Sequence, residues 1–314
     1  MASTPPDGDH WTIPDDGRAW DHATAETNGV TLHTVTAGPE DGDLVVLLHG
    51  FPEFWYAWHH QIEPLSEAGY RVVAPDLRGY NCSEKPEGVR AYDIDELVAD
   101  VVGLIEGTGR DAAHVVGHDW GGLLAWYVAA AQEDVVDRLA ILNAPHPSAY
   151  ERALRSSPTQ VAKSWYVFFF QLPILPEAAF RARDFRVVEG MLTDTPVRAD
   201  AFSETDIRYY KTALGRPGAL TAAVNYYRAM ARRSARRLLT LAGAPELPVE
   251  RPTLLLWGEQ DRALDVSLTE GLDRWVSDLR IDRFPDASHW VQFDAPERVT
   301  DSLLSHLAGG EGTR

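Results

Sequence analysis

The stretch Val115-Val116-Gly117-His118-Asp119-Trp120-Gly121-Gly122 decides how this chain folds. A short apolar run leads into a turn flanked by glycines, and the helical-looking segment Leu123–Gln132 follows it. A sharp strand-to-helix turn of this kind, a nucleophile elbow, pushes one side chain out beyond the end of a sheet. Serine usually occupies the centre of such a turn, whereas this sequence has Asp119 there.

The aspartate changes the chemistry that the turn can perform. A carboxylate is already an anion at neutral pH, so Asp119 needs no base before it attacks. We therefore expect it to attack an electrophilic alkyl carbon and to form an alkyl ester on the protein. The alternative interpretation is a helix N-cap, a position that aspartate favours. A cap accounts for one aspartate, but not for the Gly-x-Asp-x-Gly frame at the end of an apolar run.

Short apolar runs recur along the chain and alternate with amphipathic stretches. Those typical of strands buried on both faces are Leu44–Leu48, Val72–Pro75, His114–Gly117, Leu139–Asn143, Thr253–Trp257 and Ile281–Phe284. Thr24–Glu26 and Thr31–Thr36, separated by an Asn-Gly pair, predict a β-hairpin. Ile94–Ile105 and Leu268–Val276 predict helices. The alternation predicts an α/β fold, a mostly parallel eight-stranded sheet with helices on both faces.

The alternation stops between about Pro145 and Pro245, where the sequence predicts helices only. Residues 151–240 hold 15 lysines and arginines against 8 aspartates and glutamates, a net charge of +7. The whole chain has a net charge of −18, so the residues outside this segment carry −25. We predict a flexible N-terminal tail over 1–18, an α/β core over 19–145 and 246–314, and an inserted helical cap, or lid, over 146–245. The basic charge is equally consistent with a solvated face of the lid.

Composition limits the partners of the chain. Its 314 residues are 45% hydrophobic, enough for a large core, and its charge of −18 disfavours nucleic acid and anionic membrane as partners. Cys82 is the only cysteine in the sequence, so no internal disulfide is expected. The polar, acidic start, Met1 to Asp16, does not have the pattern of a secretory signal. We expect a soluble, cytoplasmic protein.

A second turn, His49–Glu53, follows the apolar run Leu44–Leu48. A turn after this strand commonly supplies one backbone N–H of an oxyanion hole, here that of Phe51. The residue after the nucleophile supplies the second N–H, here that of Trp120. Taken alone, the segment is an ordinary strand-to-helix turn. Together with Asp119, it is better interpreted as part of an active site.

Two further residues complete the expected machinery. Asp261 follows the run Thr253–Trp257, and an acid at the carboxyl end of a parallel strand points into the crevice where ligands bind. Glu259, two residues earlier, is an alternative acid. His289 follows the last predicted strand, so Asp119, the acid and His289 occur in the order nucleophile, acid, base. A neutral imidazole oriented by the acid can take a proton from water, which then hydrolyses the ester.

Aromatic residues are concentrated in two segments of the predicted lid, Trp165–Gln171 and Asn225–Arg228. Most of these rings are expected to pack in the lid core. A tyrosine hydroxyl that faces the cavity would act as an acid toward a leaving oxygen, and two phenols could share the developing charge. The residues alone leave open which tyrosines face inward, the candidates being Tyr166, Tyr209, Tyr210, Tyr226 and Tyr227.

These motifs together resemble those of the α/β-hydrolase superfamily and, within it, the soluble epoxide hydrolases. The resemblance extends from about Trp20 to Leu307 and is carried by His49–Glu53, Asp76–Tyr80, Gly117–Gly122, Trp165–Glu177, Asn225–Met230, Gly258–Asp261 and Ser288–Trp290. It implies the α/β-hydrolase fold with a helical lid. It also implies addition of water to an epoxide, through a hydroxyalkyl ester on Asp119, to give a vicinal diol.

The resemblance also implies roles in the lid. The first family tyrosine lies five residues before a Gln that precedes a Pro-containing turn, which selects Tyr166, ahead of Gln171. The second lies in an aromatic-Tyr-Arg context, which selects Tyr227 rather than Tyr226. Both would act as acids on the epoxide oxygen.

Supporting roles are expected in the turn after the first parallel strand. The resemblance implies that Glu53 helps to position the water or His289, and His49 belongs to the same supporting turn. Neither a metal nor an organic cofactor is implied, since the sequence has no metal-ligand cluster and no phosphate loop. The expected partner is a small epoxide, apolar or aromatic, in a pocket lined by Phe51, Trp120, Trp165 and Trp290. A detoxifying role is the family expectation, and a homo-oligomer is possible.

Dehalogenases with an elbow aspartate are the alternative within the superfamily. Haloacid dehalogenases need arginines beside the nucleophile, whereas Asp119 is followed by tryptophan and two glycines. Trp165 and Tyr166 stand where their lid His and Trp would be, and Phe51 stands where haloalkane dehalogenases carry Asn. A non-catalytic ligand binder is a third possibility, which the joint presence of Asp119, Asp261 and His289 argues against.

Overall fold

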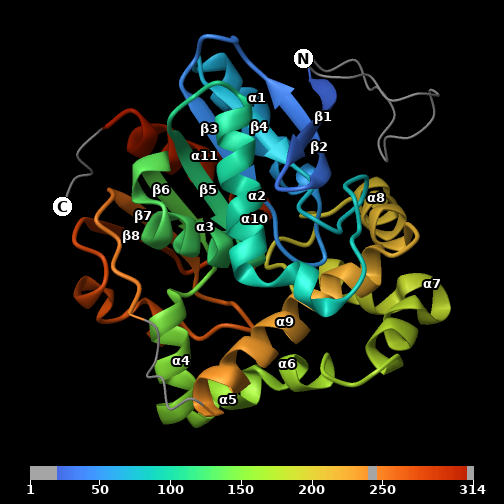
Figure 1. The fold of residues 1–314 in the computed structure, drawn as a ribbon. Helices are drawn as coiled ribbons and strands as arrows, with labels where there is room; N and C mark the ends of the chain where they lie inside the picture. Colours follow the sequence, from blue (N-terminus) through green and yellow to red (C-terminus); the bar gives the residue numbers. More distant parts are fainter. Residues whose placement is uncertain (1–19, 240–245, 310–314) are drawn as a thin grey trace.

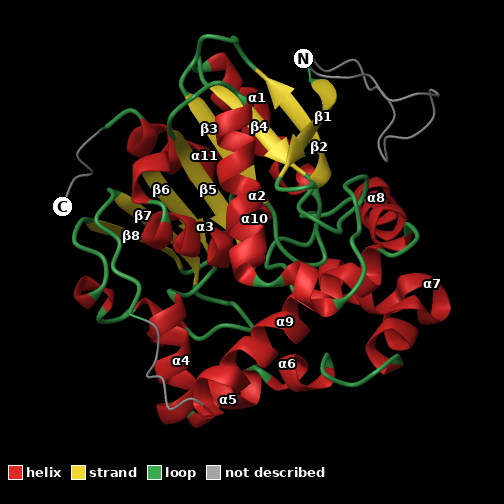
Figure 2. Cartoon of the chain, viewed as in Figure 1, coloured by secondary structure: helices red, strands yellow, loops and turns green. Residues whose placement is uncertain are grey.

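A computed structural model describes residues 20–239 and 246–309 of the chain. The predicted N-terminal tail, 1–18, lies outside the described residues. The chain forms one eight-stranded sheet in the order β1-β2-β4-β3-β5-β6-β7-β8 (Figure 2). The strands are β1 (Asp21–Thr27), β2 (Val30–Ala37), β3 (Leu44–Leu48), β4 (Arg71–Pro75), β5 (Ala113–His118), β6 (Val136–Leu142), β7 (Thr253–Gly258) and β8 (Leu279–Phe284).

The sheet is antiparallel at one edge and parallel elsewhere. β1 pairs with β2 and β2 with β4 in antiparallel register, and every pair from β4–β3 to β7–β8 is parallel. The predicted hairpin is confirmed, with Thr27 opposite Val30. Asn28 and Gly29 both have positive φ, 42° and 73°, as a two-residue hairpin turn requires. The mostly parallel α/β sheet is therefore the one that the sequence predicts.

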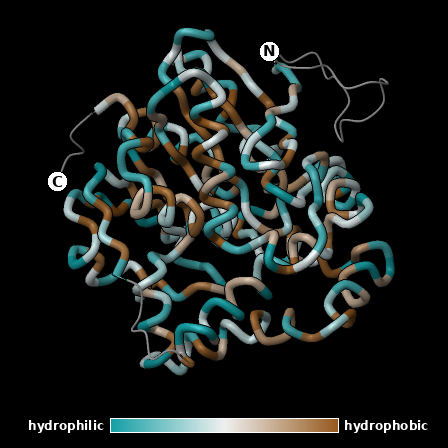
Figure 3. The backbone as a smooth tube through the Cα atoms, viewed as in Figure 1, coloured by the Kyte–Doolittle hydropathy of each residue, from teal (hydrophilic) through white to brown (hydrophobic). Residues whose placement is uncertain are grey.

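Helices cover both faces of the sheet. α2 (Ile94–Gly107) and α3 (Trp120–Ala131) contact each other on one face, and α1 (His59–Glu67) and α11 (Pro296–Leu307) contact each other on the opposite face (Figure 1). The short helix α10 (Val291–Asp294) precedes α11. Because both faces are covered, every residue of β3 and β5 is buried, and the central strands form an apolar layer (Figure 3).

One predicted helix is wrong. Leu268–Val276 forms no α-helix but two short 3₁₀ turns, η4 (Val266–Thr269) and η5 (Leu272–Arg274). Gly271, between them, has φ 63° and ψ 30°, a left-handed conformation that ends a right-handed helix. The remaining 3₁₀ turns are η1 (Trp55–Trp58), η2 (Val89–Tyr92) and η3 (Glu133–Val135).

The described residues between β6 and β7 form helices joined by loops, and none of them adds a strand to the sheet. The helices are α4 (Pro147–Ser156), α5 (Pro158–Lys163), α6 (Trp165–Phe169), α7 (Leu175–Asp194), α8 (Glu204–Gly215) and α9 (Ala219–Leu239). Figure 1 places them beyond the carboxyl ends of the parallel strands. α7 is interrupted at Ala182–Phe185, where the backbone leaves the helical region. In the described parts of the chain, no helix has the length and apolar composition needed to cross a bilayer.

Candidate active site

The turn between β5 and α3 holds Asp119 in a backbone conformation that few residues adopt, with φ 50° and ψ −118°. The flanking glycines make this turn possible. A Cβ on Gly121 would lie 2.1 Å from the carbonyl oxygen of Leu48, and one on Gly117 would lie 2.3 Å from that of Gly121. Any larger residue at either position would push α3 away from the sheet, so the Gly frame is a packing requirement of the elbow.

The two carboxylate oxygens of Asp119 have different surroundings. The backbone N–H of Phe51 donates to Oδ1 at 2.8 Å, while Oδ2 lies 3.5 Å from Nε2 of His289. Burial alone would raise the pKa of this carboxyl. The hydrogen bond and charge of His289, with the Phe51 N–H, outweigh burial and hold the pKa below the usual 3.8. Asp119 is therefore an anion at neutral pH, with Oδ1 held by a backbone donor and Oδ2 facing the imidazole.

Asp261 orients the imidazole of His289 from the other side. Its Oδ2 accepts from Nδ1 of His289 at 2.7 Å and from the Asn143 amide at 2.9 Å. Its Oδ1 accepts the backbone N–H groups of Ala263 at 2.7 Å and Leu264 at 2.9 Å. Four donors on one buried carboxyl favour its ionised form, and the pKa of Asp261 lies below 3.8 although burial opposes this.

The imidazole of His289 thus lies between two carboxylates. Burial lowers the pKa of a histidine, but the charges and hydrogen bonds of Asp261 and Asp119 outweigh it here. The pKa of His289 consequently stands well above the ordinary 6.5. Between these two charged carboxylates the side chain is an imidazolium at neutral pH.

The structure separates the two candidate acids. Glu259 is exposed at the start of the loop after β7, whereas Asp261 is 4% exposed and hydrogen-bonded to His289.

The sequence analysis missed Asn143, which follows β6. Its side-chain amide donates to both the Asp261 carboxylate and the carbonyl of Gly258. Its position at the carboxyl end of a buried parallel strand is the sequence feature that could have marked it as a site residue.

Glu53 links three segments of the site beneath the reacting groups. Its Oε2 accepts the Gly50 N–H at 2.8 Å and lies 2.8 Å from Nδ1 of His118, and its Oε1 accepts from the Gln292 amide at 3.2 Å. Nε2 of His118 lies 2.9 Å from the carbonyl oxygen of His289. A carbonyl only accepts, so this nitrogen carries a proton. Sequence analysis gave His118 no role, although it precedes the nucleophile directly.

His49 joins two turns of the core. Its Nδ1 donates to the carbonyl of Gly50 at 2.9 Å and its Nε2 accepts the Leu77 N–H at 3.0 Å. This pattern requires the neutral imidazole with its proton on Nδ1. Burial lowers the pKa of His49 and favours the same neutral form. The residue therefore supports the Gly50-Phe51 turn.

Tyr166 on α6 and Tyr227 on α9 lie against each other, with ring centroids 6.0 Å apart and planes at 86°. Tyr227 also packs edge-on against Phe51 and Trp120, at 5.6 and 4.9 Å. Burial raises the pKa of both phenols well above 10, and the charge of Asp119 raises each further. Both are therefore O–H donors at neutral pH, within the electrostatic reach of the carboxylate.

The other tyrosines have different partners. The hydroxyl of Tyr226 donates to the carbonyl of Arg78 at 2.7 Å. Tyr210 is fully buried and packs against Phe54, and Tyr209 packs against Tyr56. Of the tyrosines that the residues alone left open, the structure brings Tyr166 and Tyr227 together.

The expected pocket residues divide into two groups. Phe51, Trp120 and Trp290 are buried, and Trp290 packs against the ring of His289 at 5.4 Å. Trp165 is 64% exposed and contacts Phe169, so the structure does not bring it to the others. Helix α6 turns Tyr166 inward, and the preceding residue on so short a helix consequently faces outward.

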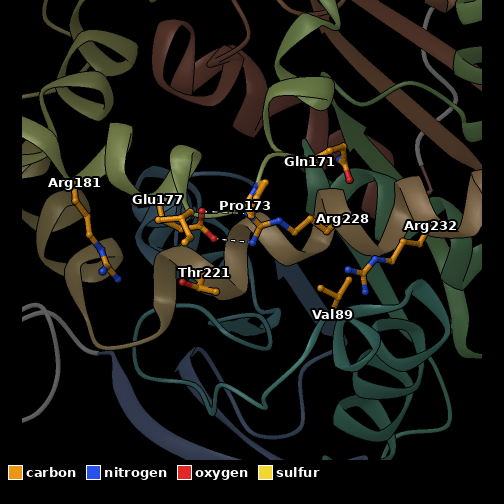
Figure 4. Close-up of a pocket in the computed structure, with 9 residues that line it drawn as sticks. Val89, Gln171, Pro173, Glu177, Arg181, Thr221, Arg228 and Arg232 are labelled. Atoms are coloured by element: carbon orange, nitrogen blue, oxygen red, sulfur yellow. Dashed lines mark hydrogen bonds and ion pairs between the residues drawn. The ribbon is translucent and has the colours of Figure 1, made fainter.

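A cavity of about 640 Å³ lies between η2, α9 and the start of α7, and none of the residues above lines it. It is lined by Val89, Gln171, Pro173, Ile174, Glu177, Arg181, Thr221, Arg228 and Arg232 (Figure 4). Arg228 crosses it and bonds to both oxygens of Glu177, at 2.7 and 3.2 Å. Arg228 also donates to the carbonyl of Phe170 at 3.1 Å. This hydrogen bond joins α9, next to Tyr227, to the end of α6.

The metal-capable side chains of the described residues lie elsewhere. Ligand atoms of His33, Asp76 and Cys82 lie within 4.8 Å of one another. Nδ1 of His33 is hydrogen-bonded directly to Oδ2 of Asp76 at 2.6 Å, and the Asn81 amide donates to the same oxygen at 2.8 Å. These hydrogen bonds hold the turn after β4 in place.

Comparison with known proteins places this geometry in a family. The family model described as the alpha/beta hydrolase fold matches residues 43–296. The chain is 43% identical over 283 residues to AB hydrolase superfamily protein YfhM of Bacillus subtilis, covering 90% of this chain and 96% of that one. It is 39% identical over 285 residues to epoxide hydrolase 3 of Xenopus tropicalis, covering 89% and 75%.

A solved structure agrees with the sequence relatives. The crystal structure of the Bacillus megaterium epoxide hydrolase in complex with an inhibitor superposes with a TM-score of 0.83 and 31% identity, covering 91% of this chain and 99% of that one. The chain belongs to the α/β-hydrolase fold family and, within it, to the epoxide hydrolases.

The charge on His289 predicts how stability depends on pH. Because its pKa is raised in the folded state, the imidazolium stabilises the fold fully below pH 6.5, and this stabilisation falls as the pH rises toward the folded pKa. We expect the wild type to have a larger free energy of unfolding than the His289→Gln variant. This difference should be greatest near pH 6 and should fall toward pH 9. Urea titrations of both proteins measure it. A difference that is constant or increases with pH would mean that His289 is neutral.

Proposed function

We propose that this protein hydrolyses epoxides to vicinal diols through a covalent ester on Asp119. The observation that carries the proposal is the arrangement of Asp119, whose Oδ1 is held by the Phe51 N–H while Oδ2 faces His289. Two neutral phenols, Tyr166 and Tyr227, lie within reach of the same carboxylate charge. The names of its relatives as epoxide hydrolases support this reaction.

The first step opens the ring. Oδ2 of Asp119 attacks one ring carbon and forms a C–O ester bond, while the bond from that carbon to the epoxide oxygen breaks and its electron pair goes to the oxygen. A phenol, Tyr166 or Tyr227, donates its proton to this oxygen. The phenolate that remains recovers a proton from the His289 imidazolium. The products of the step are a hydroxyalkyl ester, two neutral phenols and a neutral imidazole.

The ester itself prepares the second step. Esterification removes the charge of Asp119, and with it one of the two carboxylates that raise the pKa of His289. The imidazole, still oriented by Asp261, can then take a proton from water, and the resulting hydroxide attacks the ester carbonyl. The N–H groups of Phe51 and Trp120 stabilise the oxyanion. Collapse releases the diol and restores the carboxylate and the imidazolium.

The surroundings favour an apolar substrate. Phe51, Trp120, Phe170 and Phe180 are buried around Tyr227 and the nucleophile, with Phe51 and Phe170 packed edge-to-face at 5.5 Å. A haloacid substrate would need cations for its carboxylate, and the residues that follow Asp119 are Trp120 and two glycines. We therefore favour an epoxide with an apolar or aromatic substituent, with Glu53 and His118 supporting His289 from below.

Removal of the nucleophile tests the proposal most directly. Asp119→Asn replaces the attacking anion with a neutral amide, and we expect diol formation to fall by at least about a thousandfold. Turnover of styrene oxide, an aliphatic epoxide and a fatty-acid epoxide should be followed by chromatography of the diol. Asn retains the fold because it is nearly isosteric, and a melting temperature near that of wild type checks this. Activity within tenfold of wild type would exclude Asp119 as the nucleophile.

Removal of the base should separate the two steps. His289→Gln cannot activate water, so we expect the ester to form and persist. Mass spectrometry of the digested protein should show the mass of the epoxide added to the peptide containing Asp119. The same variant incubated with fluoroacetate or a haloalkane should gain no mass. An adduct from a halogenated compound alone would favour a dehalogenase.

Isotope labelling identifies the atom that water attacks. In a single turnover in heavy-oxygen water, hydroxide attacks the ester carbonyl, so the label should enter the Asp119 carboxylate and not the first diol. Mass spectrometry of the diol and of the Asp119 peptide measures both. Label in the first diol would mean that water opens the ring directly.

A further inference from the structure

We propose that Asp294 is a positioning residue for ester hydrolysis, whose carboxylate fixes the main chain around His289 and ties it to the lid. One carboxylate oxygen holds the residue that precedes the histidine, and the other holds the connection between α7 and α8. This inference rests on the proposed epoxide hydrolysis, because it concerns the step in which His289 activates water.

The first oxygen of Asp294 holds Ser288, the residue directly before His289. The backbone N–H of Ser288 donates to Oδ2 at 2.7 Å, and the Ser288 hydroxyl donates to the same oxygen at 2.6 Å. The hydroxyl oxygen in turn accepts the backbone N–H of Trp290 at 3.1 Å. Ser288 is 1% exposed, so water does not readily replace these partners. Asp294 therefore holds the main chain on both sides of the histidine.

One turn of helix brings Asp294 back to this place. α10 begins directly after Trp290, whose carbonyl accepts the N–H groups of Phe293 and Asp294, both at 2.8 Å. Between the two ends of this loop, the carbonyl oxygen of His289 lies 2.9 Å from Nε2 of His118. The main chain is thus fixed at three consecutive residues, from the core at His289 and through Asp294 at its neighbours.

The second oxygen of Asp294 reaches the lid. Oδ1 accepts the backbone N–H of Arg198 at 2.8 Å, and Arg198 lies in the connection between α7 and α8. In the same connection, the Thr195 hydroxyl accepts the indole N–H of Trp290 at 2.7 Å. Phe202 packs edge-on against the ring of Trp290, with centroids 5.6 Å apart. These contacts join the lid to the segment that carries the base.

The placement of His289 is demanding because both ring nitrogens have assigned partners. Nδ1 lies 2.7 Å from Oδ2 of Asp261, and Nε2 lies 3.5 Å from Oδ2 of Asp119. Since Asp261 occupies Nδ1, the water that attacks the ester has to lie beside Nε2. A displacement of about 1 Å from a reactive geometry can slow a step about a hundredfold. A carboxylate that fixes the main chain around His289 therefore promotes hydrolysis without touching the substrate.

The proposed role is confined to the second step. Asp119 attacks the ring carbon without the help of a base, so ester formation depends on this carboxylate and on the phenols. In hydrolysis, His289 takes a proton from water and the hydroxide attacks the ester carbonyl. The bond from this carbon to the diol oxygen then breaks, and the alkoxide takes the proton that the hydroxide brought to the carboxyl group. Loss of the Asp294 contacts should slow this step alone.

Asp294→Asn tests the role with a nearly isosteric change. The amide keeps one acceptor oxygen and replaces the other with an N–H donor, so it cannot accept from both Ser288 and Arg198. In rapid-quench single turnovers with styrene oxide, mass spectrometry of the Asp119 peptide gives the rates of ester formation and decay. We expect ester decay to slow about tenfold, the effect of one lost hydrogen bond, and ester formation to stay within twofold of wild type.

Two further variants complete the comparison. Ser288→Ala removes the hydroxyl that lies between Asp294 and the N–H of Trp290, and it should slow ester decay in the same way. Asp286→Asn is the matched control, because this carboxylate lies in the same loop but is exposed and pairs with Arg298 at 2.8 Å. The control should change neither rate.

A double-mutant cycle tests the route through His289. In a His289→Gln background, Asp294→Asn should have no further effect on the residual ester decay. An equal slowing in both backgrounds, ester formation slowed as much as decay, or decay within twofold of wild type in either Asp294→Asn or Ser288→Ala would overturn the inference. If wild type forms neither ester nor diol, the proposed function fails and this inference with it. Diol formation by wild type and by an unaffected Asp294→Asn variant refutes the role of Asp294 alone.

Discussion

The site depends on one electrostatic arrangement, the imidazole of His289 held between the carboxylates of Asp119 and Asp261. The two anions are tolerated in a mostly buried site because the cation between them and backbone or amide donors stabilise both. The same arrangement makes the protonation of His289 depend on the state of Asp119. In the proposed mechanism, an ester at Asp119 removes one anion, and the histidine becomes a base at the step that requires one.

This arrangement demands accurate placement of three loops, and buried polar groups provide it. Glu53 connects the turn after β3, the elbow residue His118 and, through Gln292, the segment after His289. Asn143 connects the end of β6 to Asp261. Removal of one partner from either group would leave a buried polar atom unpaired, which costs about 1–3 kcal/mol. The packing of the elbow glycines therefore works together with a hydrogen-bonded layer below the reacting atoms.

The sequence predicted the parts of the fold that local patterns encode. The apolar runs give the strands, and the Gly-x-Asp-x-Gly frame gives the elbow, because both depend on residues adjacent in the chain. It failed at Leu268–Val276, where the conformation of one glycine overrode an amphipathic pattern. It gave no role to Asn143 or His118, because the groups that they contact are distant in sequence.

The two lid phenols also show why the lid cannot be treated as a simple cover. Burial and the charge of Asp119 raise the pKa of both, which keeps them protonated but makes them weak acids. A weak acid can assist ring opening only if its anion is stabilised when the proton leaves. The proposed mechanism meets this need with His289, whose imidazolium returns a proton to the phenolate. Packing of the lid on the core, through Phe51, Phe170 and Tyr227, holds the phenols where the charge of Asp119 reaches both of them.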